Sequence, residues 1–315
     1  MLRSAAQRFI GMALAGLGVW CLSASPASAQ SAGTRAEIER LILQSGADVA
    51  IAFHTLDTPP GSPARLELLI QPDVSFHAAS TMKVPVMIEL FRQARLGNLR
   101  LDQTLPVRNE FKSIVDGSPY TLSMGDDSDA DVYKNIGGEM SYADLCEAMI
   151  TVSSNFATNL LIDRLSAADI QRTTLAIGAW GMNVLRGVED TKAFEQGLNN
   201  ATTARALMTL LERIARLDMV DGSSSRRMLE ILERQKFNDA IPAGLPDGIP
   251  VAHKTGEITK IHHDAAIVYG PTPYILVILV RGIEDHKQSA ALMAAVSRVL
   301  WDEVAGIPAP RTPLP

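Results

Sequence analysis

The chain has little cysteine: two residues in 315, Cys21 and Cys146. Cys21 lies in an N-terminal segment that we expect to be removed, and the bulky Trp20 before it argues against a lipoprotein. One remaining cysteine excludes an internal disulfide. The apolar neighbours Leu145 and Met149 indicate that Cys146 is buried on a helix, so we expect it to pack in the core and not to act as a nucleophile.

Long hydrophobic runs are also lacking. The apolar stretch from Phe9 to Leu22 is too short for a comfortable membrane span; Arg3 and Arg8 precede it, and small residues ending in Ala29 follow it. This pattern is typical of a secretory signal. We predict a signal peptide at residues 1–29, a periplasmic or secreted mature chain, and no stable membrane insertion after cleavage. An uncleaved anchor is the alternative.

Positive charge is not in excess. The formal net charge is −6, and it becomes −8 without residues 1–29, which contain two arginines and no acid. That balance argues against nucleic acid or an anionic membrane surface as a partner. The sequence also shows no internal repeat and no low-complexity tract. About 285 residues are enough for a large core in one composite unit, which we expect to be a monomer.

The order of elements predicts an α+β fold. A helix at Arg35–Gln44 and two β-like segments, Asp48–Leu56 and Arg65–Ile70, come first. Helical patterns then dominate to about Lys236. Strand character returns in the last part, followed by a final helix; these segments are Pro250–Lys254, Ala265–Tyr269, Tyr274–Val280 and about His286–Val304. We therefore predict one domain, 30–315. Its antiparallel sheet from both termini, flanked by helices, forms an α/β lobe (about 30–75 and 237–306), with an all-helical lobe (about 76–236) inserted and a cleft between the lobes.

Ser80 and Lys83 stand at the start of an apolar-periodic segment that runs to Leu96, with Gly97 beyond it as a typical C-cap. If Ser80 occupies the first helical turn, Lys83 lies one turn later on the same face. A lysine can activate a serine only if its pKa is lowered, by burial or by a nearby cation. By itself this pattern is weak, because serine often caps helices.

Two further polar groups follow in the chain. Ser153 and Asn155 lie between two helical runs, where a second hydroxyl could relay a proton and an amide could orient both lysine and substrate. Lys254 and Thr255 end a strand, and Gly256 would let a substrate backbone approach the strand edge closely. Each group alone fits an ordinary polar helix junction or a strand end in solvent.

Together and in this order, the three groups resemble the motifs S-x-x-K, S-D-N and K-T-G of class A β-lactamases and penicillin-binding proteins. The resemblance extends from about Arg35 to Ala305. It is particularly close in the stretch ITVSSNFATNLL, residues 150–161.

The resemblance implies roles for these residues. Ser80 would attack the carbonyl of a β-lactam or of a peptide ending in D-alanine, and Lys83 would take or relay its proton. Ser153 would deliver a proton to the departing nitrogen, while Asn155 and Lys254 hold the network. No metal or organic cofactor is implied.

The end of the K-T-G strand would bind substrate. Thr255, Gly256 and Glu257 would lie along it, and the backbone N–H groups of Ser80 and Glu257 would stabilise the oxyanion. Next to this strand, His262, His263 and Asp264 could suggest zinc. Adjacent strand residues point to opposite faces, however, so a structural or surface role is the expectation.

Several positions depart from the class A pattern. Ser154 stands where the family usually has an acid, which predicts the loss of a structural hydrogen bond. Glu257 stands where active β-lactamases have a small residue, and its carboxylate is unfavourable near a substrate carboxylate unless it turns away. The arginine that often supports that carboxylate is absent. Register places His263 there instead, and Arg281 is another candidate cation.

The carboxylate that would release the acyl-enzyme has two candidates. An ungapped register from Ser153 assigns Glu189 to this role. The local pattern E-x-x-L-N fits Glu195 to Asn199 instead, but choosing Glu195 needs an insertion and a deletion. We prefer Glu189, with Asn199 as a water-holding partner. The alternative is that both acids are on an exposed loop and have no such role.

The leading hypothesis is an exported serine β-lactamase. A D,D-peptidase or small esterase on the same scaffold is the first alternative, because fold and motifs do not determine the substrate. The second is a penicillin-binding sensor that is acylated and never turns over.

Overall fold

The computed structural model describes residues 26–56 and 65–306. The predicted signal peptide therefore lies outside the described residues, except for positions 26–29, which belong to the first helix, α1 (Pro26–Ser45). This helix is longer at its N-terminal end than the predicted Arg35–Gln44. The turn-rich segment at 58–63 and the Pro-rich end from 307 also lie outside the described residues.

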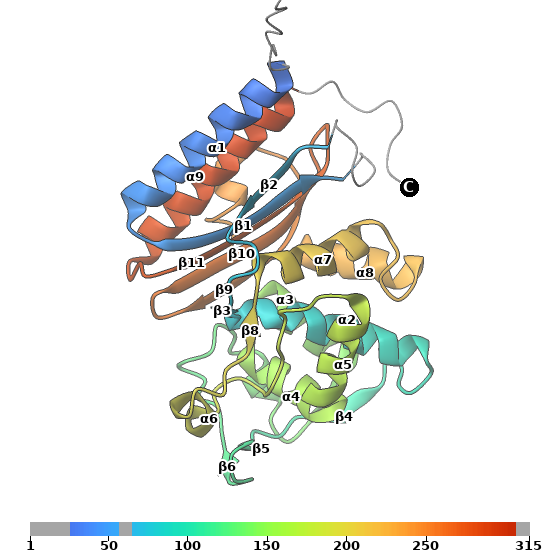
Figure 1. Cartoon of the computed structure of the whole chain (residues 1–315). Helices are drawn as coiled ribbons and strands as arrows, with labels where there is room; N and C mark the ends of the chain where they lie inside the picture. The colour runs from blue at the N-terminus through green and yellow to red at the C-terminus, as the bar shows by residue number, and fades with distance from the viewer. Residues whose placement is uncertain (1–25, 57–64, 307–315) are drawn as a thin grey trace, which may run out of the picture.

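In the described part of the chain, five strands form one antiparallel sheet in the order β2-β1-β11-β10-β9 (Figure 1). Strand β1 pairs along its whole length with β11, from Asp48 opposite Arg281 to Thr55 opposite Tyr274. This pairing joins the two ends of the sequence in one sheet and confirms the predicted α+β fold. The strand bounds are β1 (Asp48–Thr55), β2 (Glu67–Ile70), β9 (Val251–Ile258), β10 (Ile261–Val268) and β11 (Tyr274–Arg281).

Strands β9 and β10 extend beyond the segments predicted for them. Strand β9 continues to Ile258, and β10 begins at Ile261, so both strands run through residues that have polar side chains. The pairing of Thr255 with Asp264 and of Gly256 with His263 supplies the reason, because a continuous ladder satisfies the backbone groups there.

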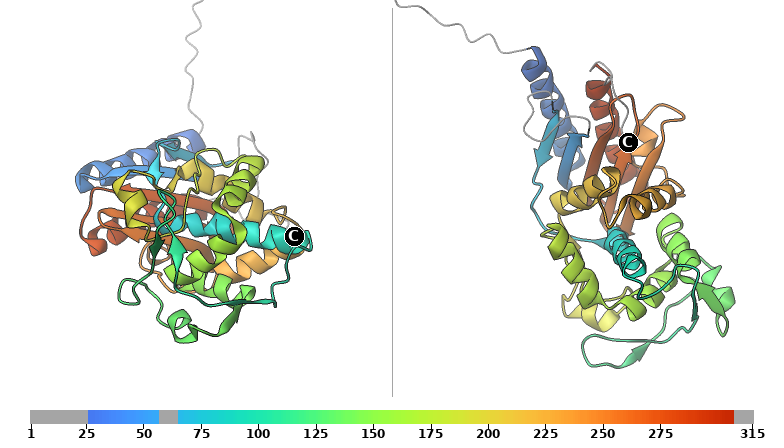
Figure 2. Two further views of the ribbon diagram at one scale, coloured as in Figure 1. Left: turned by 90° about the horizontal axis from the view of Figure 1, so that it is seen from below. Right: turned by 90° about the vertical axis from the view of Figure 1, so that its right-hand side faces the viewer.

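The sheet is covered on both faces. Helix α1 and the last helix, α9 (His286–Ala305), lie side by side on one face (Figures 1 and 2). Alternate residues of β1 take part in two different cores: Val49 and Ile51 pack in the cluster shared with α9, whereas Ala50 and Ala52 pack in the cluster on the opposite face. This explains why β1 reads as a continuous apolar run.

The opposite face of the sheet is covered by α7 and α8, which come from the end of the segment expected to form the helical lobe. The remaining helices lie farther from the sheet (Figure 1). The helical bounds are α2 (Lys83–Arg95), α3 (Tyr142–Thr151), α4 (Asn155–Leu165), α5 (Ala167–Ile177), α6 (Thr191–Glu195), α7 (Ala204–Ala215) and α8 (Gly222–Leu232), with short 3-10 helices η1 (Ala79–Met82), η2 (Val132–Asn135) and η3 (Pro242–Gly244). Short strand pairs complete the fold: β3 (Phe76–His77) with β8 (Ala201–Thr202), β4 (Thr104–Pro106) with β7 (Glu139–Ser141), and β5 (Phe111–Lys112) with β6 (Pro119–Tyr120).

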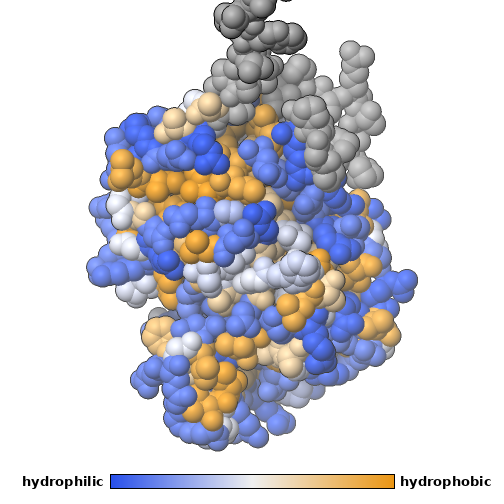
Figure 3. Space-filling model, in the orientation of Figure 1, coloured by the Kyte–Doolittle hydropathy of each residue, from blue (hydrophilic) through white to orange (hydrophobic). Residues whose placement is uncertain are grey.

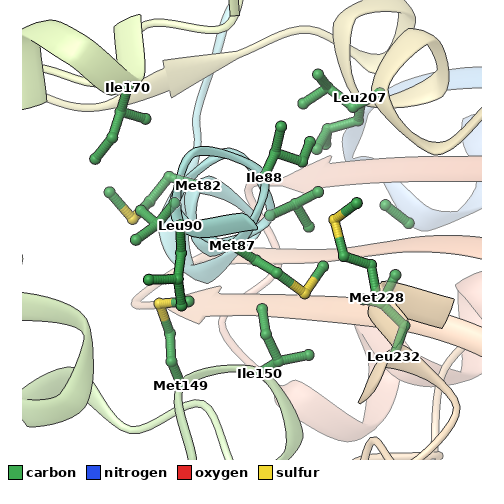
Figure 4. Close-up of a cluster of buried hydrophobic side chains, with 14 of the residues drawn as sticks. Met82, Met87, Ile88, Leu90, Met149, Ile150, Ile170, Leu207, Met228 and Leu232 are labelled. Atoms are coloured by element: carbon green, nitrogen blue, oxygen red, sulfur yellow. The ribbon is translucent and has the colours of Figure 1, made fainter. Parts of the chain in front are cut away.

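Helix α2 lies at the centre of the helical part. Its first nine residues, 83–91, are buried on every side, as expected for a helix in the interior of a large core. Side chains from four surrounding helices, α3, α5, α7 and α8, converge on it, among them Met149, Ile170, Leu207 and Met228 (Figure 4). The core thus holds the helix that carries Lys83 rigidly in place.

The molecular surface mixes hydrophilic and hydrophobic residues, and hydrophobic residues gather at the lower end of the face drawn in Figure 3. Two exposed apolar side chains, Phe194 and Leu198, belong to the region of α6. Among the described residues, no helix combines the length and the apolarity that crossing a membrane requires. Cys146 is buried on α3 with a free thiol whose pKa burial raises to about 12, which agrees with a packing role.

Candidate active site

Ser80 lies in the 3-10 turn η1 that leads directly into α2. Its place in the first α-helical turn is one condition of the sequence-based prediction, whereas the α-helix itself begins at Lys83. The residue before the serine, Ala79, has a left-handed backbone with φ of 45°, and its N–H donates to Nδ1 of His77. A strained, well-held turn therefore presents Ser80 at the base of the helix.

Lys83 is fully buried and reaches across to the junction between α3 and α4. Its Nζ donates to the backbone oxygen of Ser153 at 2.5 Å, to Ser153 Oγ at 3.2 Å and to Asn155 Oδ1 at 2.8 Å. Ser153 has a positive φ of 59°, an uncommon conformation for a residue other than glycine. In this conformation the carbonyl oxygen and the hydroxyl of Ser153 both face Lys83.

Lys254 meets the same hydroxyl from the sheet. It is fully buried on β9, and its Nζ donates to Ser153 Oγ at 3.0 Å and to the backbone oxygen of Thr255 at 2.9 Å. Two lysines from different parts of the fold thus converge on one serine hydroxyl. Because that oxygen accepts from both amines, its own proton is available to a third group.

Burial lowers the pKa of Lys83 to about 7, against the opposing effect of the negative charges of Asp127 and Glu189. The pKa of Lys254 is lowered well below its ordinary value, first by burial and second by repulsion from Lys83. The sequence-based prediction requires that burial or a nearby cation lower the pKa of Lys83. In the structure, desolvation is the main cause of the lowered pKa of Lys83. An amine whose pKa is near 7 is partly neutral at pH 7 and can accept a proton in that form.

Gly256 allows β9 to approach the serine. A Cβ atom at this position would lie 3.0 Å from the backbone nitrogens of both Ser80 and Thr81. This distance is shorter than ordinary Cβ contacts, and the backbone of Ser80 and Thr81 cannot move away easily. The strand edge therefore runs directly against η1, which brings the backbone around Glu257 and the Ser80 amide to the same place.

The carboxylate at the N-terminus of α4 comes from a distant segment of the chain. Ser154, at the position of the missing acid, is buried and caps α4 by accepting from the Ala157 N–H. Asp127, from the loop between β6 and η2, accepts from the N–H groups of Asn155 and Phe156 at 2.9 and 2.8 Å. A carboxylate at a helix N-terminus satisfies free donors and is favoured by the helix dipole. Asp127 was not identified from the sequence, because its distance from the motif along the chain hides the contact.

Glu189 bonds the same side chain as Lys83, that of Asn155, and lies on a loop that other parts of the fold hold in place. Asn159, on α4, accepts from the Val188 N–H at 2.7 Å and donates to its carbonyl oxygen at 2.9 Å. A Cβ atom on Gly187 would lie 2.5 Å from Asn159 Oδ1, so only glycine fits there. Asp190 anchors the other end of the loop through Ser113 Oγ at 2.8 Å.

The side chain of Glu189 joins the lysine network. Its Oε1 accepts from Asn155 Nδ2 at 2.9 Å. Its pKa is raised, mainly by burial and further by the charges of Asp126 and Asp127. Like Ser153, Glu189 has a positive φ, of 61°. Strained residues that the surrounding structure holds in place are common at functional sites.

The other candidate residues of this loop lie apart. Glu195 ends α6 and is exposed, and it lines neither of the hollows that Ser80 lines. Asn199 accepts from the Arg186 guanidinium at 3.1 Å and also lines neither hollow, so its expected place beside Glu189 is wrong. Its neighbour Asn200 does line the hollow shared by Ser80 and Glu189, while its Oδ1 accepts from two backbone N–H groups of the same loop.

Two hollows meet at Ser80. The larger hollow, about 510 Å³, extends past Ser153 and Thr255 toward α9. The smaller hollow, about 350 Å³, extends past Glu189 toward α6. Ser80, Asn155 and Glu257 line both. A bound molecule whose reacting carbon lies at Ser80 can therefore extend in two directions, one toward α9 and one toward α6.

Neither of the cations expected beside the K-T-G strand lies in these hollows. His263 is buried; its Nε2 donates to the His77 carbonyl and its Nδ1 accepts from the Val280 N–H, and burial lowers its pKa to about 4. It is therefore a neutral support for the segment before Ser80. Arg281 pairs with Asp48 at 2.5 Å and lies over the Phe76 ring, 4.4 Å from its centroid, and it lines neither hollow.

The end of the larger hollow contains a histidine that the sequence identified only as the start of a helix. His286 Nδ1 lies 2.8 Å from Glu257 Oε1, and its Nε2 lies 2.5 Å from Asp239 Oδ2. Glu257 thus turns toward α9, which is the condition the sequence set for it. No local signal marks His286, because its partners lie 29 and 47 positions away.

The neighbouring His262 and Asp264 have separate structural partners. His262 contacts Ser289 on α9, while Asp264 lies 2.9 Å from Nδ1 of the buried His253. Within residues 26–56 and 65–306, no group of three or more His, Cys, Asp or Glu side chains is arranged as a metal site.

Several known proteins resemble this chain in sequence or in fold. A family model described as "Beta-lactamase enzyme family" matches residues 33–304. A beta-lactamase of Bacillus licheniformis is 26% identical over 299 residues, which cover 93% of this chain and 91% of that protein. The solved structure of PBP-A superposes with a TM-score of 0.74 at 26% identity, covering 87% of this chain and 97% of PBP-A. A PBP-A mutant solved as an acyl-enzyme complex with penicillin G has a TM-score of 0.72 at 26% identity, with 89% and 97% covered.

Proposed function

We propose, since the chain belongs to the beta-lactamase enzyme family, that it is exported and hydrolyses β-lactams through an ester on Ser80. It is a class A β-lactamase-like serine hydrolase. One observation carries the proposal of turnover: Asn155 holds the Lys83 amine on one side of its amide and the Glu189 carboxylate on the other. A base for each half of the reaction is thus present beside the Ser80 hollows.

In the acylation half, Ser80 Oγ attacks the ring carbonyl carbon, and the ring C–N bond breaks as the ester forms. The Ser80 proton passes to the neutral Lys83 amine. Ser153 Oγ donates its proton to the departing nitrogen and regains one from Lys83, with which it is already hydrogen-bonded. Backbone N–H groups of Ser80 and Glu257 would stabilise the oxyanion. Thr255 and Gly256 would lie along the substrate, and Lys254 would hold Ser153 in place.

In the deacylation half, a water attacks the ester carbonyl and gives its proton to Glu189. The ester bond breaks and Ser80 Oγ regains a proton, so the net change is one water added across the ring amide. An acyl-serine is long-lived unless a base activates that water. The position of Glu189 on a clamped loop, beside Ser80 in the smaller hollow and bonded to Asn155, supports its assignment over Glu195, which lines neither hollow.

A D,D-peptidase that releases D-alanine, or a penicillin-binding protein that keeps its acyl group, is the second candidate. The likeness to PBP-A favours it, because the two chains are 26% identical over nearly the whole of PBP-A. The departures at Ser154 and Glu257 point the same way. The two functions share acylation of Ser80 and differ in the fate of the ester.

Intact-protein mass spectrometry with benzylpenicillin, followed over time, separates these functions. For a β-lactamase we expect an adduct of one drug equivalent that forms and then disappears, while the free drug gains one water. Ser80→Ala should remain folded and form no adduct. A permanent adduct would identify a penicillin-binding protein, and release of D-alanine from a short peptide would identify the peptidase. An adduct on the alanine variant would exclude Ser80 as the nucleophile.

Export and assembly have their own tests. The proposal of a signal peptide at residues 1–29 expects a periplasmic or secreted protein whose N-terminal sequence begins near Gln30. A mature protein that retains residues 1–29 would contradict it. Light scattering of the purified chain should give the mass of a monomer.

A further inference from the structure

We propose that His286 is a specificity-determining residue: its cation holds Glu257 and Asp239 and thereby allows the larger hollow to bind a substrate that carries a carboxylate. The inference rests on the proposed function, because it concerns the molecule that acylates Ser80. It names a residue outside the three motifs, on the first turn of α9.

The hydrogen bonds of His286 identify its charge state. Each ring nitrogen faces a carboxylate oxygen, Nδ1 toward Glu257 and Nε2 toward Asp239. An ionised carboxylate only accepts hydrogen bonds, so both ring nitrogens must carry a proton, which makes the ring an imidazolium. The two acids also raise the pKa of His286 against the effect of burial.

Neighbouring side chains hold the His286 ring in position. It stacks on His262 with ring centroids 4.4 Å apart and an angle of 24° between planes. His262 is itself buried and bonded to Ser289 on α9. Burial lowers the pKa of His262, and the neighbouring His286 cation lowers it further, so the charge of the stacked pair belongs to His286.

The balance of charge in the larger hollow makes this cation important. Three lining residues are acids, Asp126, Asp239 and Glu257, and the charged lining residues of opposite sign are Lys236 and His286. Lys254 donates to Ser153 and Thr255 behind the surface of the hollow. Without the imidazolium, three carboxylates would face one exposed lysine, and an anionic substrate would be repelled.

The His286 cation also determines where the Glu257 carboxylate points. This residue directly follows Gly256 on β9 and lines both hollows at Ser80, so its carboxylate can turn toward a substrate or away from it. Its side chain is 54% exposed, and its described charged partner is His286. Removal of His286 would release a negative charge beside the strand that binds substrate. A substrate without a carboxylate would not be affected by that charge.

The test compares benzylpenicillin with its methyl ester, which lacks the negative charge. The second-order rate of adduct formation is measured by mass spectrometry for both compounds. In His286→Gln we expect the ratio of the two rates, acid over ester, to fall by a factor of about 1.5 to 5, the range of a partly exposed charge interaction. The double variant His286→Gln/Glu257→Gln should restore most of the ratio. Lys260→Gln also removes one positive charge, lies outside the larger hollow, and should leave the ratio unchanged.

If both rates fall equally, so that their ratio is unchanged, His286 only supports the fold and the inference is rejected. No change in either rate, or a double variant whose ratio does not recover, would reject it too. These outcomes differ from a failure of the proposed function. If the parent protein is acylated by neither compound, the proposed β-lactam chemistry fails first, and with it the basis of this inference.

Discussion

Asn155 donates a hydrogen bond from Nδ2 to Glu189 Oε1 across 2.9 Å. Through its other side-chain atom, Oδ1, the same amide accepts from the Lys83 amine. One residue at the start of α4 thus contacts both of the groups for which we propose different tasks, Lys83 as the base for forming the ester and Glu189 as the base for hydrolysing it. This relationship leads to predictions in which the two halves of the reaction are measured separately.

Acylation should require a neutral Lys83. The pKa of about 7 means that the amine is increasingly protonated as the pH falls below 7, so the rate of adduct formation should decrease on the acid side. Lys83→Arg retains a charge that cannot be removed in this range, and it should slow acylation by about a hundredfold or more. Lys260→Arg, on an exposed turn, is the control. Near-normal acylation by Lys83→Arg would exclude the lysine as the base.

Deacylation should depend on Glu189 and not on Glu195. Glu189→Gln should be acylated at close to the parent rate but should retain the adduct, with hydrolysis slowed by about a hundred- to ten-thousandfold. Glu195→Gln, on the same loop, should behave like the parent. Because the pKa of Glu189 is raised, hydrolysis should be lost on acidification at a higher pH than an ordinary carboxylate would give. The reverse pattern in the two variants would transfer the role to Glu195.

The loop that carries Glu189 should tolerate no side chain at Gly187. An alanine Cβ would lie 2.5 Å from Asn159 Oδ1 and would push the loop away from α4. We expect Gly187→Ala to destabilise the protein by about 1–3 kcal/mol in denaturant unfolding and to slow hydrolysis of the adduct more than its formation. Gly222→Ala is the matched control, since its nearest atoms would be 3.7 Å away. Equal effects of the two variants would argue against a clamped loop.

Asp127 should influence acylation through charge. Its carboxylate raises the pKa of Lys83, so Asp127→Asn should move the acid limb of the acylation profile to lower pH. The variant should also lose about 1 kcal/mol of stability, because the carboxylate caps α4. Asp129→Asn changes the same charge in the same loop and should leave the profile in place. A profile that stays fixed in Asp127→Asn would show that this carboxylate acts on the helix alone.

The sequence predicted those parts of the site that depend on local order. Ser80 and Lys83 are three residues apart where a helix begins, and the structure forms the turn η1 and the start of α2 in this segment. The sheet from both termini could also be predicted, since β1 and β11 have the continuous apolar character of strands covered on two sides. The exact boundaries of the strands could not be predicted, because the polar residues at the ends of β9 and β10 become part of the strands only through pairing with each other.

Contacts between distant segments were decided by the tertiary structure. Asp127 caps the helix at which Ser154 stands in place of an acid, Asn200 and not Asn199 lines a hollow with Glu189, and His286 and not His263 lines the larger hollow. The physical reason is the same in each case. A carboxylate, an amide or an imidazole acts at a point in space, and a folded chain can bring that group from any segment. The amino-acid sequence by itself determined the enzyme family and the three motifs, whereas packing decided which distant residues surround these motifs and how far burial lowers the pKa of Lys83.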